Sequence, residues 1–405
     1  MKHLFVCFTK YQLINAINVK VNVIRDEVAD IVLINYGGVF TEIFDKLEKS
    51  NIFENVYMHV SSVDGIERYI RNLRDGKNGI SLANALKNDL NKIYDEFNSK
   101  INGIEYKINC KIIADKRIDF SLYNHIWAYV TIPVVLDIVR AVKKNCNCKC
   151  LVSGIDEGVG SYTSDALKMY KEYDEICLYE PEAAVYKDVF QPINAIPKID
   201  KNDKCFVNLL NFVFDFKLTD KIDLHNKVIF FDQCYVPMPK YLHNMNWLKK
   251  LFLSRNYKKH LTESIYYDNQ LRLFDELMKC YSSEDVLVKL HPRTQIDRLD
   301  DYRKYDVDFL PSLQSPWELF CLNCNISDSI WVTLVSSAVH TCDFTIKSDE
   351  KKFCLYGYCA FNAKTNLQER EYIDFLEWYQ NHTEGVVLPQ NRNSLKKWIE
   401  SNQLF

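Results

Sequence analysis

Glycine and proline are scarce in this chain, which has 11 Gly and 10 Pro among 405 residues. Collagen-like and linker-dominated architectures are therefore excluded. The chain also lacks a strong excess of charge, because 51 Lys and Arg are balanced by 54 Asp and Glu, for a formal net charge of −3. Nucleic-acid binding through a basic surface is not expected. The 47% of hydrophobic residues and 26% of charged residues are typical of a globular protein, and the length predicts two or three domains.

Long hydrophobic runs are also missing. The longest apolar stretch, 126–136, contains Thr131 and Pro133, whereas a membrane-spanning helix needs about 20 apolar residues. The apolar run near the N-terminus ends before Lys10 and does not have the form of a signal peptide. We therefore expect a cytoplasmic protein.

The 14 cysteines are dispersed through the chain, and in the cytosol they are expected to be reduced and mostly buried. Cys146, Cys148 and Cys150 form a C-x-C-x-C cluster. A structural zinc site normally uses C-x₂₋₄-C spacing and a second pair of ligands. We interpret the cluster as a loop before a strand, with metal binding as the alternative.

The N-terminal part of the chain predicts alternating strands and helices. Buried strands are expected at 3–8, 30–35 and 56–59, with helices at 11–24 and at 41–49, where Thr41 is the expected N-cap. This β-α-β-α-β alternation is typical of a parallel sheet with right-handed crossovers.

A second α/β pattern begins further along the chain. The segment 126–143 is expected to be one long buried helix, kinked or started at its proline, and 192–204 has the composition of a linker. Strand periodicity then restarts at 227–231. We predict two Rossmann-like domains, 1–200 and 226–390, facing a central cleft, and a helix within 391–405 that can pack back on the first domain.

Open parallel sheets bind ligands at the carboxyl ends of their strands. The first motif at such a position is Asp156-Glu157-Gly158, after a strand predicted to end at Ser153. Adjacent carboxylates there can supply a general base, and glycine allows close approach of a ligand to the backbone. The alternative is an ordinary acidic turn.

Two further motifs follow strands of the second domain. His291-Pro292 ends the strand predicted at 286–290, and proline fixes the exit of the chain, so the imidazole can contact a phosphate or protonate a leaving group. Ser336-Ser337 follows the strand predicted at 330–332 and opens a helix, where hydroxyls and N–H groups can bind an anion. The alternatives are a histidine that closes a turn and a plain serine N-cap.

The three motifs in this order resemble those of the bacterial sialyltransferases, which share an acidic D/E-D/E-G element, an HP element and a later serine pair. The opening Thr9-Lys10-Tyr11-Gln12 is similar to the start of glycosyltransferase family 52, and the extended acidic segment through Tyr162 resembles the polysialyltransferase relatives. The resemblance implies a GT-B-like fold of two domains.

The resemblance also implies roles for individual residues. Asp156 would be the general base, His291 would contact the phosphate of CMP-sialic acid and help CMP to leave, and Ser336 and Ser337 would hold the same phosphate. Glu318, at a helix start predicted near Pro316, could accept from the ribose hydroxyls. The neighbouring residues Glu157, Gly158 and Pro292 would complete the substrate-binding set.

These roles imply an inverting sialyltransferase that acts on a galactoside or sialoside acceptor of a bacterial capsule or lipooligosaccharide. A nucleoside monophosphate donor has no diphosphate to be bridged, so we expect no cofactor and no metal, although Asp306-Val307-Asp308 matches a D-x-D motif. A GT-B enzyme with another nucleotide-sugar donor is the first alternative. A non-catalytic glycan-binding subunit of a polysaccharide assembly complex is the second.

Two assignments remain open at this point. Asp232, after the strand predicted at 227–231, is a rival general base. The basic amphipathic segment 240–261 predicts either peripheral contact with the inner membrane surface or a solvated helix packed on the second domain. A homodimer is a further expectation.

Overall fold

The structure is a computed structural model that describes residues 1–35, 39–59, 118–130, 132–146, 149–163, 171–186, 189–217, 222–238, 254–292, 294, 296–310, 315–361 and 367–402. A charged helical segment expected at 65–99, a strand expected at 111–114 and most of the basic segment 240–261 lie outside these residues.

The first sheet is parallel throughout its described strands. Its order is β3-β2-β1-β4-β5-β6-β7. This is the strand order of a Rossmann fold, extended by one strand, with its switch point between β1 and β4. The strands are β1 (Lys2–Cys7), β2 (Val28–Ile34), β3 (Val56–His59), β4 (His125–Ala128), β5 (Leu151–Ile155), β6 (Glu175–Leu178) and β7 (Ile193–Ala195).

Among the described residues, the helices that connect these strands are α1 (Lys10–Asn22), α2 (Phe44–Lys49) and α5 (Pro133–Asn145). Helix α1 begins with a capping box, in which the Thr9 side chain accepts from the Gln12 N–H and the Gln12 side chain accepts from the Thr9 N–H. The prediction of Thr41 as the N-cap of α2 was wrong, because the helix starts three residues later and Ile43 stands at its N-cap.

The prediction of one helix over 126–143 was wrong for the residues before the proline and right that a helix can start at the proline. Its first part is β4, and the helix α5 begins at Pro133, in the first turn, where proline costs no hydrogen bond. A continuous apolar run does not distinguish a strand buried on both faces from a buried helix.

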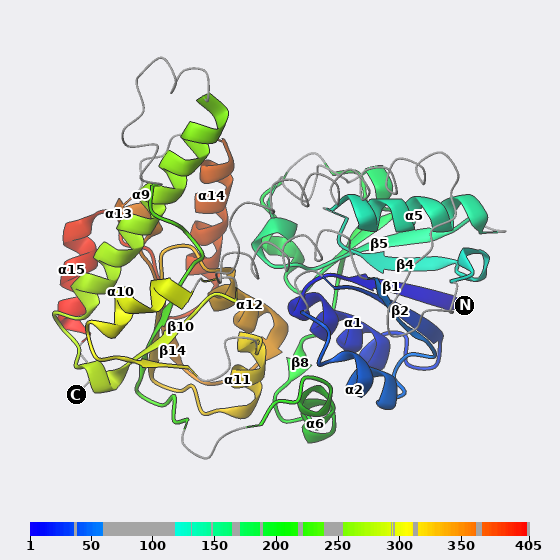
Figure 1. The fold of residues 1–405 in the computed structure, drawn as a ribbon, viewed down its shortest axis with the longest axis horizontal. Helices are drawn as coiled ribbons and strands as arrows, with labels where there is room; N and C mark the ends of the chain where they lie inside the picture. The colour runs from blue at the N-terminus through cyan, green and yellow to red at the C-terminus, as the bar shows by residue number, and fades with distance from the viewer. Residues whose placement is uncertain are drawn as a thin grey trace, which may run out of the picture.

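The second sheet repeats the same topology. Its strands are parallel in the order β11-β10-β9-β12-β14-β15, with the switch point between β9 and β12. The strands are β9 (Val228–Phe231), β10 (Val286–Lys289), β11 (Asp308–Phe309), β12 (Ser329–Thr333), β14 (Lys352–Tyr356) and β15 (Val386–Val387). The helices of this half are α9 (Ser254–Leu277), α10 (Asp300–Arg303), α11 (Trp317–Asn323), α12 (Ser337–Thr345), α13 (Tyr358–Phe361), α14 (Leu367–His382) and α15 (Arg392–Ser401). The predicted pair of Rossmann-like α/β units is confirmed, and they lie side by side in Figure 1.

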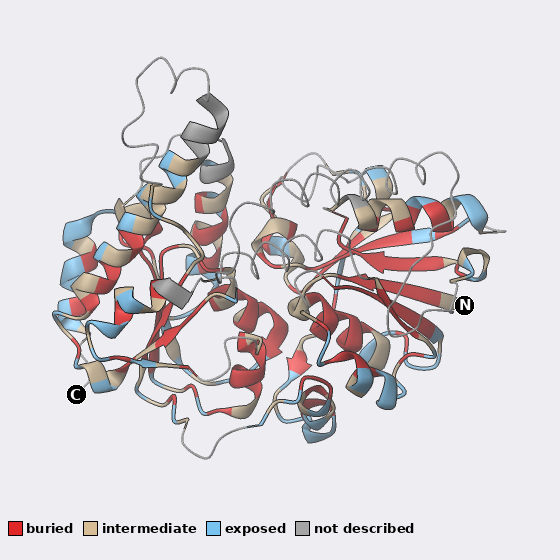
Figure 2. Ribbon diagram, viewed as in Figure 1, coloured by how far each residue is buried: buried red, intermediate tan, exposed pale blue. Residues whose placement is uncertain are grey.

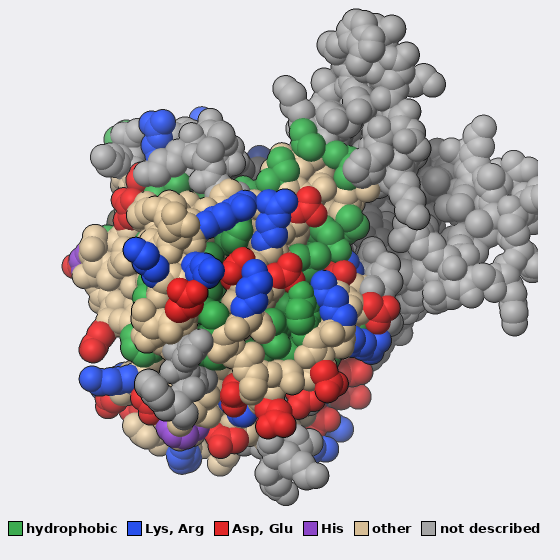
Figure 3. Space-filling model, turned by 90° about the vertical axis from the view of Figure 1, so that its left-hand side faces the viewer, with side chains coloured by type: hydrophobic (Ala, Val, Ile, Leu, Met, Phe, Trp, Pro, Cys, Tyr) green, Lys and Arg blue, Asp and Glu red, His purple; other side chains and the backbone are tan. Residues whose placement is uncertain are grey.

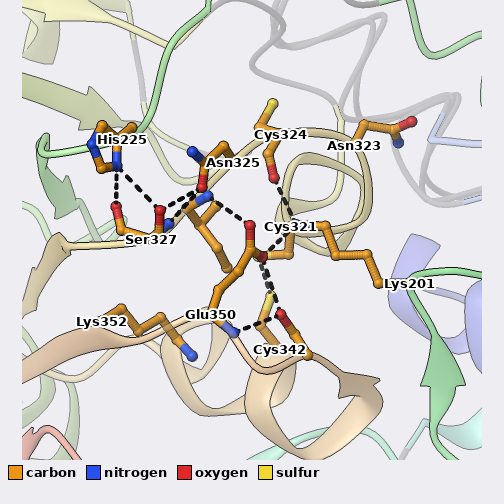
Figure 4. Close-up of polar contacts among 12 residues, drawn as sticks. Lys201, His225, Cys321, Asn323, Cys324, Asn325, Ser327, Cys342, Glu350 and Lys352 are labelled. Carbon is orange, nitrogen blue, oxygen red and sulfur yellow. Dashed lines mark hydrogen bonds and ion pairs between the residues drawn. The ribbon is translucent and has the colours of Figure 1, made fainter.

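The segment predicted to be a linker contains two short strands. Its first part, β7, closes the first sheet, and its second part, β8 (Ile199–Asp200), pairs in parallel with β13 (Ile346–Lys347) of the second half. The next residue, Lys201, forms an ion pair with Glu350 and donates to the Cys324 carbonyl oxygen at 2.7 Å (Figure 4). Helix α6 (Lys204–Val213) follows. The crossing segment is therefore tied to both halves.

The C-terminal helix packs on the second half, and the expectation that it packs back on the first was wrong. Leu395 and Ile399 of α15 lie in the apolar core of the second sheet, and the Tyr281 hydroxyl donates to the Asn402 carbonyl oxygen at 2.8 Å. Figure 1 shows α15 beside α9, on the side of the molecule away from the first sheet.

Burial follows the two sheets, whose strands form the buried layer of each half (Figure 2). On the outer face of the second half, Lys and Arg side chains are interspersed with Asp and Glu (Figure 3). Within the described residues, no helix is both long and apolar enough to cross a membrane. Short 3₁₀ turns complete the structure at Phe120–Leu122, Val159–Ser161, Pro181–Ala183, Ser283–Asp285 and Ile296–Leu299.

We predict that Gly385→Ala destabilises the second half. Gly385 has φ = 84°, and a Cβ atom there would lie 2.2 Å from the Lys352 carbonyl oxygen. The left-handed backbone and the clash together should lower the free energy of unfolding by about 2 kcal/mol or more in urea titrations. As a control, Asn51→Gly at an exposed position with φ = 55° should change it by less than about 1 kcal/mol. Wild-type stability of Gly385→Ala would contradict this backbone geometry.

Candidate active site

The carboxyl edges of the two sheets meet at Gly158 and the first turns of α12. Gly158 has φ = 88°, and a Cβ atom built on it would lie 3.3 Å from Thr341 Cγ2 and 3.6 Å from Ser337 Cβ. Only glycine adopts this backbone conformation readily and allows such a close approach. The acidic motif of the first sheet and the serine pair of the second, which are far apart in the sequence, are thereby neighbours.

Asp156 lies directly after β5, and its side chain is enclosed by hydrogen-bond donors of the protein. The residue is fully buried, and its carboxylate accepts from the Gly158 N–H at 2.7 Å and from the Tyr162 hydroxyl. Longer contacts, both 3.4 Å, come from the Tyr11 hydroxyl and the Tyr179 N–H. Burial raises the pKa of Asp156 to about 6, although these hydrogen bonds oppose the shift. The carboxylate shapes the loop and is shielded from a ligand.

Glu157 is half-buried and has fewer partners. The Thr9 hydroxyl donates to its carboxylate at 3.2 Å, and its own N–H donates to Ser161 Oγ at 2.7 Å. Removal from water raises the pKa of Glu157 to about 8, and the nearby carboxylates of Asp156 and Glu318 add to the shift. Of the two adjacent acids, Glu157 is the more exposed and has the higher pKa.

Glu318 enters the same neighbourhood from the second half. The helix predicted to start near Pro316 is α11, which places Glu318 in its first turn, where it is 4% exposed. Its carboxylate accepts from the Thr341 hydroxyl at 2.8 Å. Burial raises the pKa of Glu318, while this hydrogen bond and the positive charge of Lys289 oppose the shift.

Two lysines, one from each half, complete the charges of the site. Lys289 is the last residue of β10 and is 7% exposed. Burial lowers the pKa of Lys289 to about 8; Glu318 opposes the shift, and Lys10, the first residue of α1, adds to it. Lys289 was not predicted from the sequence as a site residue, although a lysine within an apolar strand and two residues before His291 can indicate an anion site.

His291 and Pro292 form a turn at the carboxyl end of β10. The Thr294 N–H donates to the His291 carbonyl oxygen at 2.8 Å, and the His291 N–H donates to the Asp232 carboxylate. His291 is half-buried and Pro292 is exposed. Because β10 and β12 flank β9 on either side, this turn and the serine pair lie at the same edge of the second sheet.

The serine pair begins α12 as predicted. Ser336 is the N-cap, its side chain makes no capping hydrogen bond, and its N–H donates to Thr333 Oγ1 at 2.8 Å. Ser337 is the first helical residue and is half-buried. The positive end of the helix dipole therefore lies at the edge where Gly158 approaches, and Ser337 Oγ would lie 3.8 Å from a Cβ atom built on Gly158.

Within the described residues, no three His, Cys, Asp or Glu side chains are grouped as metal ligands. Cys146 and Cys150 are free thiols, and Cys148 lies outside the described residues. Asp306 and Asp308 are exposed at the amino end of β11, the opposite sheet edge from His291. The D-x-D sequence is therefore not part of this site.

Comparison with known proteins adds little to this description. No family model and no curated protein matches the chain. Among solved structures, an α/β-galactoside α-2,3-sialyltransferase from the luminous marine bacterium Photobacterium phosphoreum is similar, with 10% identity and a TM-score of 0.45 over 95% of this chain and 97% of that one. A likeness at this level carries no argument about substrate or reaction, which depend on the residues above.

We predict that the two adjacent acids differ in their effect on stability. Asp156→Asn replaces one acceptor oxygen by a donor among the hydrogen bonds of a buried loop, and should lower the free energy of unfolding by about 2–3 kcal/mol. Glu157→Gln, in a half-buried side chain that can still bond with Thr9 and Gln12, should change it by less than about 1 kcal/mol. Urea unfolding of both variants decides the point, and equal losses would contradict the structural role given to Asp156.

Proposed function

We propose that the chain is an inverting glycosyltransferase that transfers sialic acid from CMP-sialic acid to a galactoside or sialoside of a bacterial surface glycan. The proposal combines the resemblance of the sequence motifs with the neighbourhood described above. One observation supports it most strongly: Gly158 of the acidic motif lies against Ser337 and Thr341, so a donor held at the serine pair would lie beside a carboxylate of the other half.

The contacts favour Glu157 as the general base. Asp156, the residue to which the sequence resemblance gives this role, already accepts several hydrogen bonds and has no exposed surface. Glu157 is accessible, and a base with a pKa near 8 accepts a proton from a sugar hydroxyl more readily than an ordinary carboxylate does. In this scheme Asp156 holds the loop and Glu157 does the proton transfer.

The donor is proposed to bind through its two negative charges, one on the phosphate and one on the sialic acid carboxylate. Lys10 and Lys289 are near enough for their charges to interact, and burial strengthens their attraction for anions. His291, Ser336 and Ser337 would contact the phosphate, and Glu318 would accept from the ribose hydroxyls.

The reaction follows from this placement. The acceptor hydroxyl oxygen bonds to the anomeric carbon of sialic acid while the bond from that carbon to the phosphate oxygen breaks. Glu157 takes the hydroxyl proton, and CMP leaves with the electron pair of the broken bond, stabilised by the positive groups of the site. Direct displacement inverts the anomeric centre. We also propose that no metal is needed.

A glycosyltransferase with another nucleotide-sugar donor is the second candidate, because phosphate groups alone do not select the sugar. The lysine pair suits two negative charges, which CMP-sialic acid and a nucleoside diphosphate sugar both carry, so the order of the sequence motifs is what favours CMP-sialic acid. Cytoplasmic location, contact with the inner membrane through 240–261 and a homodimer also remain proposals, and most of 240–261 lies outside the described residues.

The proposed function predicts turnover of CMP-sialic acid. The purified chain is incubated with CMP-sialic acid, UDP-sugars or GDP-sugars and a panel of galactosides and sialosides, and products are detected by mass spectrometry. We expect an acceptor product larger by one sialic acid only with CMP-sialic acid, and the same yield after EDTA treatment. Transfer from a UDP- or GDP-sugar alone would favour the second candidate, and loss of activity in EDTA that Mg²⁺ restores would overturn the metal-free mechanism.

We predict an unusual pH dependence that belongs to Glu157. A general base acts when deprotonated, so kcat/KM should rise as the pH approaches about 8, and loss of the Lys289 proton should lower it again at higher pH. Glu157→Gln should lower the rate by about 10²-fold or more and remove this rise. Glu384→Gln, at an exposed glutamate, is the matched control and should keep the wild-type rate and the wild-type pH dependence. A rise centred near pH 4–5 in the wild type, as for an exposed glutamate, would contradict the assignment.

A further inference from the structure

Asp232, at the carboxyl end of β9, is buried among donors. Its side chain is 0% exposed. Oδ1 accepts from Gln270 Nε2 at 2.6 Å and from the Tyr302 hydroxyl at 2.5 Å. Oδ2 accepts from the Thr294 hydroxyl at 2.5 Å, and the carboxylate also accepts from the His291 N–H. With these partners around it, Asp232 has no room to take a proton from an acceptor sugar, so it does not suit the role of general base.

Two of these bonds hold the ends of one turn. The turn runs from His291 to Thr294 and is closed by the Thr294 N–H, which donates to the His291 carbonyl oxygen at 2.8 Å. Asp232 binds the N–H of the first residue and the side chain of the fourth. Pro292 fixes its own φ within this turn and restricts the backbone of His291 before it. The backbone from which the imidazole of His291 projects is therefore fixed mainly by one carboxylate.

Several neighbours stabilise the charged form of Asp232 that this role needs, against the larger opposing effect of burial. Arg298 Nη2 lies 3.5 Å from Asp232 Oδ1, and Arg298 is 6% exposed. Burial raises the pKa of Asp232, but the hydroxyls of Thr294 and Tyr302 and the charge of Arg298 oppose the shift. An ionised carboxylate only accepts hydrogen bonds, so each donor around it keeps one orientation.

We propose that Asp232 is a positioning residue that holds the His291–Thr294 turn and so directs the His291 imidazole at the donor phosphate. The second part of this statement depends on the proposed function. The first part concerns only the protein and can be tested without substrate.

The first experiment follows His291 by NMR in protein labelled with ¹⁵N-histidine. The spectrum of His291→Ala identifies the His291 ring signals by their loss. Asp232→Asn should shift these signals and change the midpoint of their titration. The control is Asp30→Asn, which alters another buried carboxylate, in the first half, that accepts hydrogen bonds from Tyr123 and Asn55. This variant should leave the His291 signals unchanged. Unchanged His291 signals in Asp232→Asn would overturn the proposal.

Thr294 provides a milder variant for the case in which Asp232→Asn does not fold. Thr294→Val removes the hydroxyl that binds Oδ2 and should shift the His291 signals in the same direction but by less. Thr294→Ser keeps the hydroxyl and should restore the wild-type spectrum. A Thr294→Val spectrum identical to that of the wild type would count against the proposal.

The second experiment uses kinetics with CMP-sialic acid and CMP. Asp232→Asn should lower kcat/KM by about 10- to 100-fold, as expected for a misplaced contact group, and weaken CMP binding in calorimetry. It should keep the pH dependence of the wild type, because Glu157 is intact. The double variant Asp232→Asn with His291→Ala should be no slower than His291→Ala alone, because both changes remove the same contact of His291 with the phosphate.

The outcomes separate the two proposals. Multiplicative losses in the double variant, or loss of the pH dependence in Asp232→Asn, would show that Asp232 acts independently of His291 and would overturn the inference. If the wild type neither transfers sialic acid nor binds CMP, the proposed function fails, and the NMR experiment still decides whether Asp232 positions His291.

Discussion

The close approach of the Gly158 backbone to α12 is the constraint on which the candidate site depends. A side chain at this position would require both a rare backbone conformation and space occupied by Thr341 and Ser337. Around this contact, the hydroxyls of Tyr11 and Thr345 are 2.9 Å apart, and the Tyr162 ring packs on Phe344 at 5.3 Å. The two sheets are thus held edge to edge by the same residues that shape the acidic loop.

Each sheet uses one buried aspartate to hold a loop that carries an accessible functional group. Asp156 follows β5 and orders the loop that presents Glu157, while Asp232 follows β9 and orders the turn that presents His291. In both cases the carboxylate accepts hydrogen bonds from a main-chain N–H and from a hydroxyl of the same loop. These come from Gly158 and Tyr162 for Asp156, and from His291 and Thr294 for Asp232. Burying an ionised carboxylate is costly, so it is tolerated only where several donors surround it. A buried aspartate of this kind makes the loop rigid, which is useful where the loop must hold a side chain in a fixed position.

Much of the architecture could be predicted from the sequence, because the alternation of apolar strands and amphipathic helices determines a parallel sheet, and the motif residues follow strands. The division of roles within Asp156-Glu157 could not, since it depends on Tyr11, Tyr162 and Tyr179, which reach Asp156 from distant positions in the chain. The run 126–143 was misassigned because an apolar run has no distinctive period. Lys10 was seen only as part of a motif, since its nearness to Lys289 arises from contact between the two halves.

Burial at the meeting edges explains both unusual titrating groups of the site. It raises the pKa of Glu157 and lowers that of Lys289, and it brings both to about 8, so the charged form of each is poorly stabilised by the protein. A ligand that places an anion at Lys289 favours its protonated form, and a hydroxyl at Glu157 can donate to the carboxylate. A substrate pair with both features, an anionic donor and a neutral sugar acceptor, would therefore supply stabilising interactions to the half-buried Glu157 and to the buried Lys289.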